Sequence, residues 1–444
     1  MPDTIFALAT ASGRAGIAVL RVSGPAAGTA LAALAGKCPA PRRATRARFS
    51  DPRTGEAIDD GLMLLFPGPN SFTGETVAEL QVHGGRAVVA ALLAALGALP
   101  GLRLAEPGEF TRRAFENGKL DLTAAEGLAD LVAAETAAQR RQALRQLDGE
   151  LGRVYEGWRA RLLRSLAQLE AEIDFPDEGL PQDLRQRVAA EAAALRDEMA
   201  RHLADGGRGE RLREGVAVAI VGPPNAGKSS LMNALARRDV AITSASAGTT
   251  RDVIEVALDL GGYPVLLADT AGLREAADEV EAEGVRRAWT RAAAADLRLV
   301  LVDAMQPVEP AALAGLIDAD AIVIANKTDL APGGVADWAD ALGAGRALRL
   351  SVRTGAGMEA LLERLEAEVA RRFAPGAAPL VTRARHRRAL EDCVAALERF
   401  AGAGLPELAA EDLRAATRAL GRITGRVDVE DMLDIVFREF CIGK

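Results

Sequence analysis

The sequence is poor in aromatic residues and in cysteine, and each shortage narrows the classes of protein it can encode. Aromatic side chains make up 4% of the 444 residues, while hydrophobic residues together reach 49%. The core must therefore be built from Ala, Leu and Val, and a chain rich in Ala and Leu favours helix. Cys38, Cys393 and Cys441 lie far apart without CxxC spacing. This spacing indicates neither a disulfide framework nor a zinc site, and the scattered histidines indicate no His-based metal site.

Long apolar runs are also missing. No stretch approaches the length of apolar sequence that spans a bilayer. The first residues, MPDTIFALATASGRAG, lack the basic start and the long apolar run of a signal peptide. We therefore expect a soluble, cytoplasmic protein that makes no membrane contact.

An excess of positive charge is absent as well. The net charge is -8 at pH 7 and the pI is about 5.3. The surface as a whole therefore cannot attract a polyanion, and any contact with RNA must use a local cluster of arginines. Two arginine clusters are candidates for such a contact, at 140–164 and 383–388. The alternative is that each is an ordinary solvated face of a helix.

The length and the pattern of apolar residues predict several domains. A chain of 444 residues is too long for one core. Residues 1–118 read as a compact α+β domain, with strands at 16–22, 61–66 and 77–82 and a helix at 86–99. Residues 119–211 carry apolar residues at helical spacing, which predicts long amphipathic helices. These helices are expected at 123–145, 151–172 and 182–203, with Thr123 and Glu126 as a capping box.

The pattern changes at Gly215. Residues 212–376 alternate short apolar runs with helical stretches, which is typical of a doubly wound parallel sheet. The expected strands are 216–221, 265–268, 297–302, 321–325 and 347–350. Residues 377–444 return to helical patterns, at 381–400 and 407–440. We predict a multidomain protein in which an α/β P-loop GTPase domain is inserted into a long-helix domain.

A phosphate-binding loop follows the first of these strands. GPPNAGKSS at 222–230 fits G-x-x-x-x-G-K-[ST] and opens a helix at 229–237. Loop amides and the helix N-terminus are expected to hold the phosphates. Lys228 should reach the β- and γ-phosphates, and Ser229 should bind Mg²⁺. The expected contacts in this loop are Asn225, Ala226, Gly227, Lys228, Ser229 and Ser230.

Three further motifs follow later strands. DTAG at 269–272 places Asp269 near Mg²⁺ and the Gly272 amide near the γ-phosphate. NKTD at 326–329 selects guanine, because Asp329 accepts from ring N–H groups that adenine lacks. Its neighbours Asn326 and Lys327 support the base pocket. SVRTG at 351–355 supplies the last base-binding loop, through Ser351, Val352 and Arg353. Motifs in this order, each at a strand end, predict GTP binding and hydrolysis.

The sequence of the switch segments does not decide which residue orients the attacking water. AGTTRD at 247–252 offers Thr250, with Thr249 as the alternative, to close over Mg²⁺. Leu273 follows DTAG where many small GTPases carry a water-orienting Gln, so another group must act. Glu281 is a candidate among several acids of that segment: Asp278, Glu279, Glu281 and Glu283. Asn225, with the segment 244–248, is a candidate site for a monovalent cation.

The chain resembles the tRNA-modification GTPase family called MnmE or TrmE. The resemblance covers nearly the whole length. Its motifs are GIAVLRVSG at 16–24, GPNSFTGE at 68–75, HGG at 83–85, PGEFTRRAFENGKLDL at 107–122, GPPNAGKSSLMNAL at 222–235, AGTTRD at 247–252, DTAGLRE at 269–275 and CIGK at 441–444. Several of these lie outside the GTPase domain, which separates this family from other translation-associated GTPases.

The resemblance implies partners and cofactors. It implies a homodimer joined through N-terminal folate-binding domains, and a flavoprotein partner, MnmG (GidA), in a heterotetramer. Together these would modify C5 of the wobble uridine of certain tRNAs. The reaction would use GTP, Mg²⁺, FAD and a one-carbon unit from the 5,10-methylene or 5-formyl form of tetrahydrofolate. K⁺ would promote association of GTPase domains and hydrolysis.

The resemblance also assigns roles to residues of this chain. Glu281 becomes the water-orienting catalytic residue beside Lys228. Asn225 becomes a K⁺ ligand, to which the switch segment with Ser244 and Ser246 would add backbone carbonyls. The motifs themselves place Mg²⁺ at Ser229 and Thr250. Cys441 matches a terminal cysteine that serves the modification, although a packing role beside Phe437 and Phe440 is the alternative. The folate site is expected to use polar residues within the N-terminal motifs: Arg21, Glu79, Arg113 and Lys119.

Two other functions compete with tRNA modification. A GTPase of ribosome assembly would share the nucleotide motifs but would need a strongly basic accessory domain, which the sequence lacks. A dimerisation scaffold is disfavoured by the intact Lys228, Asp269 and Asp329.

Overall fold

A computed structural model of the chain describes residues 3–175, 181, 183–238, 240–242, 255–269, 293–306, 308, 313, 315–331, 347–373, 379–427, 430–438, 440 and 442–443. The chain divides into two compact units. The first comprises Met1–Ala129, Gln146–Ala192 and Ala395–Lys444, and the second comprises Asp130–Arg145 and Ala193–Val394. Two long helices, α7 and α13, run from one unit into the other.

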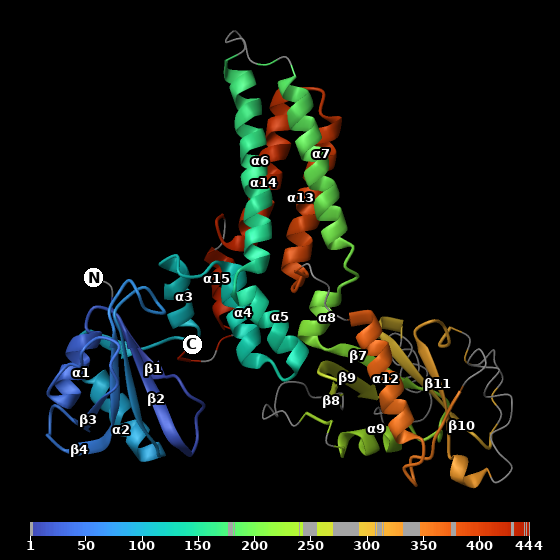
Figure 1. Cartoon of the computed structure of the whole chain (residues 1–444), viewed down its shortest axis with the longest axis horizontal. Coiled ribbons are helices and arrows are strands. Elements are labelled where there is room, and N and C mark those ends of the chain that lie inside the picture. The colour runs from blue at the N-terminus through green and yellow to red at the C-terminus, as the bar shows by residue number, and fades with distance from the viewer. Residues whose placement is uncertain are drawn as a thin grey trace, which may run out of the picture. The chain divides into compact units, whose positions relative to one another are not determined.

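The first unit begins with a six-stranded sheet in the order β3-β4-β5-β2-β1-β6 (Figure 1). Neighbouring strands are antiparallel except β1 and β6, which are parallel. The strands are β1 (Thr4–Leu8), β2 (Ala15–Ser23), β3 (Thr45–Ser50), β4 (Ala57–Phe66), β5 (Val77–Gly84) and β6 (Leu102–Leu104). Helices α1 (Ala27–Ala35) and α2 (Arg86–Gly97) pack on one face. The α+β domain predicted here is confirmed.

Strand alternation separates the two faces of this sheet. Ala18, Leu20 and Val22 of β2 point into the core formed with α1 and α2. Arg21, between them, points to the opposite face, where its guanidinium lies 5.9 Å from the centroid of the Phe110 ring. A polar side chain is thus presented on the face that the two helices leave uncovered.

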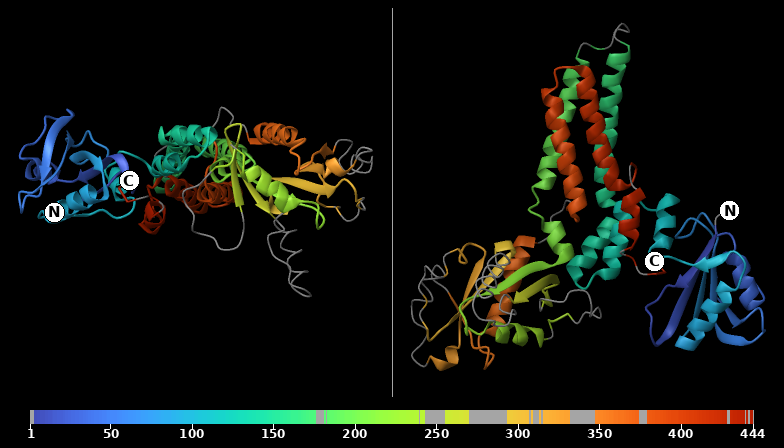
Figure 2. Two further views of the ribbon diagram at one scale, coloured as in Figure 1. Left: turned by 90° about the horizontal axis from the view of Figure 1, so that it is seen from below. Right: turned by 180° about the vertical axis from the view of Figure 1, so that it is seen from behind.

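Helices make up most of the remaining first unit. They are α3 (Glu109–Glu116), α4 (Leu122–Ala133), α6 (Glu150–Asp174), α7 (Leu184–Leu203), α13 (Ala384–Gly402), α14 (Pro406–Thr424) and α15 (Glu430–Arg438). Helices α6 and α14 lie side by side (Figure 2). Thr424 Oγ1 donates to Glu156 at 2.5 Å, and Arg414 pairs with Glu170 at 2.7 Å. The long-helix domain predicted from the spacing of apolar residues is therefore confirmed.

Two of the predicted helices are each broken in two. The stretch predicted as one helix at 123–145 forms α4 and α5 (Ala137–Leu147). Thr136 and Gln139 start α5 as a capping box, because Gln139 Oε1 accepts from the Thr136 amide and Thr136 Oγ1 accepts from the Gln139 amide. The stretch predicted at 407–440 ends α14 at Gly425, whose φ of 82° is the left-handed conformation that terminates helices.

The capping box predicted at Thr123 and Glu126 is wrong. Asp121 caps α4 instead, since its Oδ1 accepts from the Ala124 amide and from Thr123 Oγ1, both at 2.7 Å. Thr123 therefore lies inside the helix. A carboxylate competes better than a hydroxyl for the free amides of a first turn, because its charge also favours the positive end of the helix.

The second unit contains a six-stranded sheet in the order β12-β11-β10-β7-β9-β8. Its strands are β7 (Val216–Val221), β8 (Glu255–Leu260), β9 (Tyr263–Asp269), β10 (Leu297–Asp303), β11 (Ala321–Asn326) and β12 (Leu348–Arg349). All neighbours are parallel except the edge pair β8 and β9. Helices α8 (Arg208–Glu214), α9 (Lys228–Ala236) and α12 (Met358–Phe373) cover one face. This is the predicted α/β GTPase domain.

Burial on both faces explains the unbroken apolar runs of this sheet. Val218 and Ile220 of β7 join a core with α9 and α12, whereas Ala219 and Val221 join a second core on the other face. The sheet is thus rigid where its strands end, and those ends carry the nucleotide motifs. Among the residues the structure describes, none of the helices has the length and apolar character that a bilayer span requires.

Candidate nucleotide site

The phosphate loop leaves β7 through positions that only glycine can occupy. Gly222 has φ 145°, and a Cβ there would lie 2.0 Å from the carbonyl oxygen of Leu301. Gly227 has φ 101°, and a Cβ there would lie 2.4 Å from Asn326 Nδ2. Both backbone angles disfavour L side chains. The two glycines therefore allow a tight cradle against β10 and β11, of the kind that fits phosphate.

Lys228 is held inside this cradle. It begins α9, and its Nζ donates to the carbonyl oxygens of Gly222 and Pro223, both at 2.9 Å. These oxygens surround the ammonium as phosphate oxygens would. Ala226 is buried beneath the loop, and Asn225 adopts φ 60°. A phosphate chain thus fits the loop, and Ser229 follows Lys228 in the first turn of α9.

Asn326 ties the phosphate loop to the base loop. Its Nδ2 donates to the carbonyl oxygen of Ala226 at 2.7 Å, and its Oδ1 accepts from the Val352 amide at 3.2 Å. The side chain is buried, so both hydrogen bonds are shielded from water. Asn326 therefore joins two loops that are more than a hundred residues apart in the sequence.

Asp329, which the sequence predicts to select guanine, carries a carboxylate that two side chains hold in place. Ser351 Oγ donates to its Oδ1 at 2.6 Å, and Arg353 Nη2 pairs with its Oδ2 at 2.6 Å. The Ser351 hydrogen bond holds the pKa of Asp329 below its usual value against the effect of burial, and Arg353 lowers the pKa further. An acceptor that stays charged is what the two N–H groups of guanine require.

Asp303 belongs to the site and was missed from the sequence. It ends β10, and its Oδ2 accepts from Lys327 Nζ at 2.7 Å. Burial opposes ionisation of Asp303, but the hydrogen bonds from Lys327 and from the Met305 amide outweigh it and lower the pKa. The sequence did hold a signal for Asp303. This residue ends a predicted strand, and the next strand along the chain leads into NKTD. Lys327 itself has φ 63°, a left-handed conformation.

Several predicted site residues lie outside the described residues: Ser244, Ser246, Thr249, Thr250, Gly272, Glu281 and Cys441. Asp269 is described as the last residue of β9, without its side chain. The structure thus brings together Lys228, Asn326, Lys327, Asp329, Ser351, Val352 and Arg353. No group of three or more His, Cys, Asp or Glu gathers as a metal cluster in the described part.

Comparison with known proteins extends the similarity beyond this domain. The family model described as MnmE helical domain matches residues 122–441, and that described as GTP-binding protein TrmE N-terminus matches residues 4–119. Relatives from Parvibaculum lavamentivorans and Paramagnetospirillum magneticum, each named tRNA modification GTPase MnmE, are both 60% identical, over 451 and 447 residues, with 100% of each chain covered. One of that name from Rhodospirillum rubrum is 58% identical over 458 residues, covering 100% of this chain and 99% of its own.

The chain belongs to the MnmE family.

The N-terminal domain of this MnmE chain concentrates charge around Arg21. Arg21 Nη2 pairs with Glu79 at 3.0 Å, and its guanidinium lies 5.5 Å from the centroid of the Phe72 ring. Lys119 Nζ donates to the carbonyl oxygen of Pro69 at 3.0 Å. Arg113 differs in its surroundings. Its guanidinium pairs with the carboxylates of Asp3, Glu75 and Glu109, and its side chain is only 10% exposed. Arg113 is thus occupied by carboxylates of its own domain, whereas Arg21 has one carboxylate partner and lies beside two aromatic rings.

The C-terminal tail packs on the N-terminal domain within the first unit. Ile442 forms an antiparallel bridge with Pro107, and a Cβ on Gly443 would lie 2.2 Å from the carbonyl oxygen of Leu8. Phe440 is buried with Leu122 and Phe437 in one cluster. The residues on both sides of Cys441 are thus anchored.

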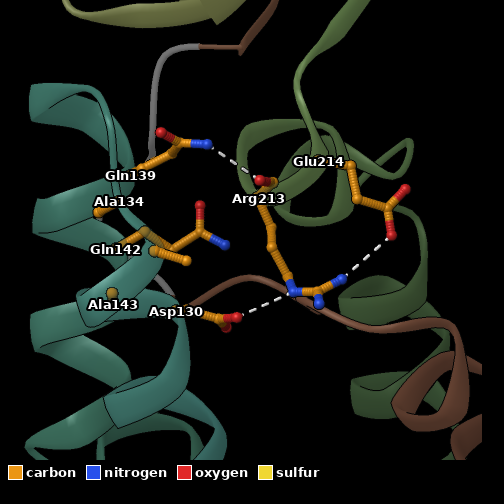
Figure 3. A pocket seen from close by; sticks show the side chains of 8 residues that line it. Asp130, Ala134, Gln139, Gln142, Ala143, Arg213 and Glu214 are labelled. Carbon is orange, nitrogen blue, oxygen red and sulfur yellow. Dashed lines mark hydrogen bonds and ion pairs between the residues drawn. The ribbon is translucent and has the colours of Figure 1, made fainter. Parts of the chain in front are cut away.

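A separate pocket of about 160 Å³ lies at the entrance to the GTPase domain (Figure 3). Its lining residues are Asp130, Ala133, Ala134, Gln139, Gln142, Ala143, Arg213 and Glu214. Asp130 accepts from Arg213 Nε at 3.0 Å and from Arg383 Nη2 at 2.8 Å. These two arginines precede β7 and follow α12, so Asp130 joins both ends of the inserted domain. None of the nucleotide motifs lines this pocket.

Proposed function

We propose that this protein hydrolyses GTP and couples hydrolysis to the modification of C5 of the wobble uridine in certain tRNAs. One observation carries the proposal. A connected nucleotide site, from Lys228 through Asn326 to Asp329, occurs in a chain that is 60% identical over its whole length to proteins named tRNA modification GTPases.

The proposed chemistry follows from the residues of the site. Lys228 binds the β- and γ-phosphates, and Ser229 with Thr250 holds Mg²⁺, which neutralises charge on the phosphates when bound. Ser230, Asp269 and Gly272 complete the phosphate side. Asn326, Lys327, Asp329, Ser351, Val352 and Arg353 hold guanine. The Leu273 side chain cannot form a hydrogen bond, and the family resemblance gives the role of orienting the attacking water to Glu281.

The proposed partners extend the family resemblance to this chain. Residues 1–118 form the folate-binding and dimerisation domain, with Arg21, Glu79 and Lys119 facing a tetrahydrofolate derivative that supplies one carbon. Residues 119–211 and 377–444 form the helical domain around the GTPase domain at 212–376. A flavoprotein of the MnmG type and tRNA complete a cytoplasmic complex, in which Cys441 serves the modification.

A complementation experiment tests the central proposal. A strain that lacks the gene receives the wild-type chain, the Lys228→Ala variant or the Cys441→Ser variant, and its wobble uridines are measured by mass spectrometry. We expect modification with the wild type only. Cys441→Ser should keep GTP turnover, whereas Lys228→Ala should lose it. Full modification in the Lys228→Ala strain would contradict coupling to GTP.

Potassium is proposed as the activator. Asn225 lies in the phosphate loop with a side-chain oxygen, and Ser244 and Ser246 follow in the switch segment. K⁺ held there would place positive charge where transition-state charge develops. GTP turnover should rise in K⁺ over Na⁺ at matched ionic strength. Equal turnover in the two salts would refute this part of the proposal.

A further inference from the structure

The two arginine clusters that qualified as RNA contacts differ in their surroundings. In the cluster at 383–388, Arg383 pairs with Asp130 at 2.8 Å and is 10% exposed. Arg387 pairs with Asp205 and with Glu210, each at 2.8 Å. These guanidinium groups are neutralised by carboxylates of their own domain. Arg383 and Arg387 hold the helices together and are not available to phosphate, whereas Arg388 is exposed and forms no ion pair in the described part of the chain.

Helix α5 shows the opposite arrangement. Its sequence, AAQRRQALRQL, contains three arginines and no acidic residue, in a chain whose net charge is -8. Arg140 and Arg141 are exposed, and neither forms an ion pair within the described part of the chain. In α6, Arg159 pairs with Glu156 and Arg161 with Glu191, whereas Arg164 is exposed and forms no ion pair among the described residues. Two exposed arginines without ion pairs are thus adjacent in the sequence of α5.

The inner side of α5 is fixed to the GTPase domain. Ala138 is buried in the core of that domain, and its amide donates to the carbonyl oxygen of Gly262 at 2.8 Å. Gln139 Nε2 donates to the carbonyl oxygen of Arg213 at 3.0 Å, and Gln142 Nε2 to that of Gly209 at 2.9 Å. Gly262 lies in the turn between β8 and β9. The helix is thus held by its apolar and amide side chains, and Arg140 and Arg141 take no part in these contacts.

We propose that α5 is an RNA-binding helix, and that Arg140 and Arg141 contact phosphates of the tRNA backbone. This inference rests on the proposed function for its partner. Planar guanidinium groups bind phosphate oxygens in pairs. An acidic chain repels RNA from most of its surface, so a positive patch fixed on a rigid helix decides where RNA approaches. An acidic protein surface is the competing occupant of such a patch, and the experiment separates the two.

The test compares two double variants of the full-length protein that change the net charge equally. Arg140→Gln with Arg141→Gln removes the proposed contacts. Arg364→Gln with Arg371→Gln is the control, because these α12 arginines are 58% and 64% exposed and already pair with Glu368. Binding to an unmodified tRNA transcript with a wobble uridine is measured by fluorescence anisotropy at several salt concentrations. GTP turnover without RNA is measured in parallel and should match the wild type in both variants.

The Kd for tRNA should be about 10-fold higher for the α5 variant than for the wild type. The slope of log Kd against log salt concentration should fall by about 1.5, because each lost phosphate contact lowers this slope by about 0.7 to 0.9. Arg140→Lys with Arg141→Lys should retain most of the affinity. An unchanged Kd and slope, or a loss equal to that of the control, would overturn the assignment of α5 while leaving the proposed function intact. A wild-type protein that binds no tRNA would overturn both. Loss of binding to an acidic protein partner with unchanged tRNA binding would show that α5 serves protein association.

Discussion

Asp329 illustrates how much of the base specificity depends on one side chain. Both of its carboxylate oxygens already have donors, Ser351 on Oδ1 and Arg353 on Oδ2. Ser351 is 1% exposed, so its hydroxyl keeps the carboxylate in place. Arg353 is 74% exposed and its ion pair is screened by water, so it contributes little to the position of Asp329.

Asp329→Asn should weaken GTP binding by roughly 150-fold or more, because two hydrogen bonds to a charged acceptor are lost at about 1.5 kcal/mol or more each. The amide donates where the carboxylate accepted, so xanthosine triphosphate should become the preferred ligand. A competition assay with both nucleotides measures the change. Arg353→Gln is the control. The loop at 351–355 is proposed to contact guanine through its backbone, so loss of this exposed side chain should alter the affinity for GTP less than about 5-fold. Retained preference for GTP in the Asp329 variant would refute the base-site assignment.

The water-positioning residue is a second question at this scale. Glu281→Ala should lower kcat by about 100-fold and leave the Kd for GTP nearly unchanged, since water is oriented chiefly in the transition state. Single-turnover hydrolysis and equilibrium binding separate these effects. Asp278→Ala and Glu283→Ala serve as matched controls from the same acidic segment. A larger loss in either control would mean that a different acid performs this role.

Single backbone positions decide where the helices end. Gly425 has φ 82°, and a Cβ there would lie 2.7 Å from two atoms of the Phe115 ring. It separates α14 from α15, and α15 carries Phe437 into a cluster with Leu122. The turn at Gly425 thus determines whether the C-terminal segment reaches the N-terminal part of its unit.

Gly425→Ala should destabilise the first unit by about 1 to 3 kcal/mol, through the strained left-handed conformation and the contact with Phe115. Urea unfolding followed by circular dichroism measures the loss. Gly404→Ala is the control, since a Cβ there has no neighbour within 4 Å and the position needs no left-handed backbone. It should change the free energy of unfolding by less than about 0.5 kcal/mol. Equal effects of the two substitutions would show that Gly425 is not required by the turn.

Ion pairs with different degrees of burial affect the molecule as a whole. Burial alone would raise the pKa of the carboxyl groups in these pairs, but hydrogen bonds and charge from neighbouring Arg or Lys lower it more. The groups with lowered pKa values include Asp3, Glu109, Asp303, Asp318 and Glu368. They occur in both units, so acid should affect both.

The melting temperature should therefore fall as the pH drops. A carboxyl group with a lowered pKa in the folded state stabilises the fold fully above its unfolded pKa. The unfolded values are near 3.8 for Asp and 4.5 for Glu, so stability is lost from about pH 4.5 downward, as the pH approaches the lowered folded values. Differential scanning calorimetry between pH 7 and pH 3 measures the change. A melting temperature that stays constant or rises over this range would contradict the prediction.

The sequence by itself determined the class of the molecule and the identity of its nucleotide motifs. A phosphate loop is built from contiguous residues, so Gly222 and Lys228 are recognisable without a structure. Strands buried on both faces, such as β7, appear as unbroken apolar runs. Windows of helical periodicity joined separate helices at two places, where Gly425 ends α14 and where Thr136 begins α5.

Only the tertiary structure decided which polar residues work together. Asn326 with Ala226, Lys327 with Asp303, and Arg113 with Asp3 each join parts of the chain that only the fold brings close. The order of strands in the sheets determines which of these residues come into contact, and no local sequence pattern encodes that order. The same holds for charge, since Arg140 and Arg387 look alike in the sequence. Their difference arises because acidic side chains of α8 and its preceding turn surround Arg387, while Arg140 lies on the outer side of α5.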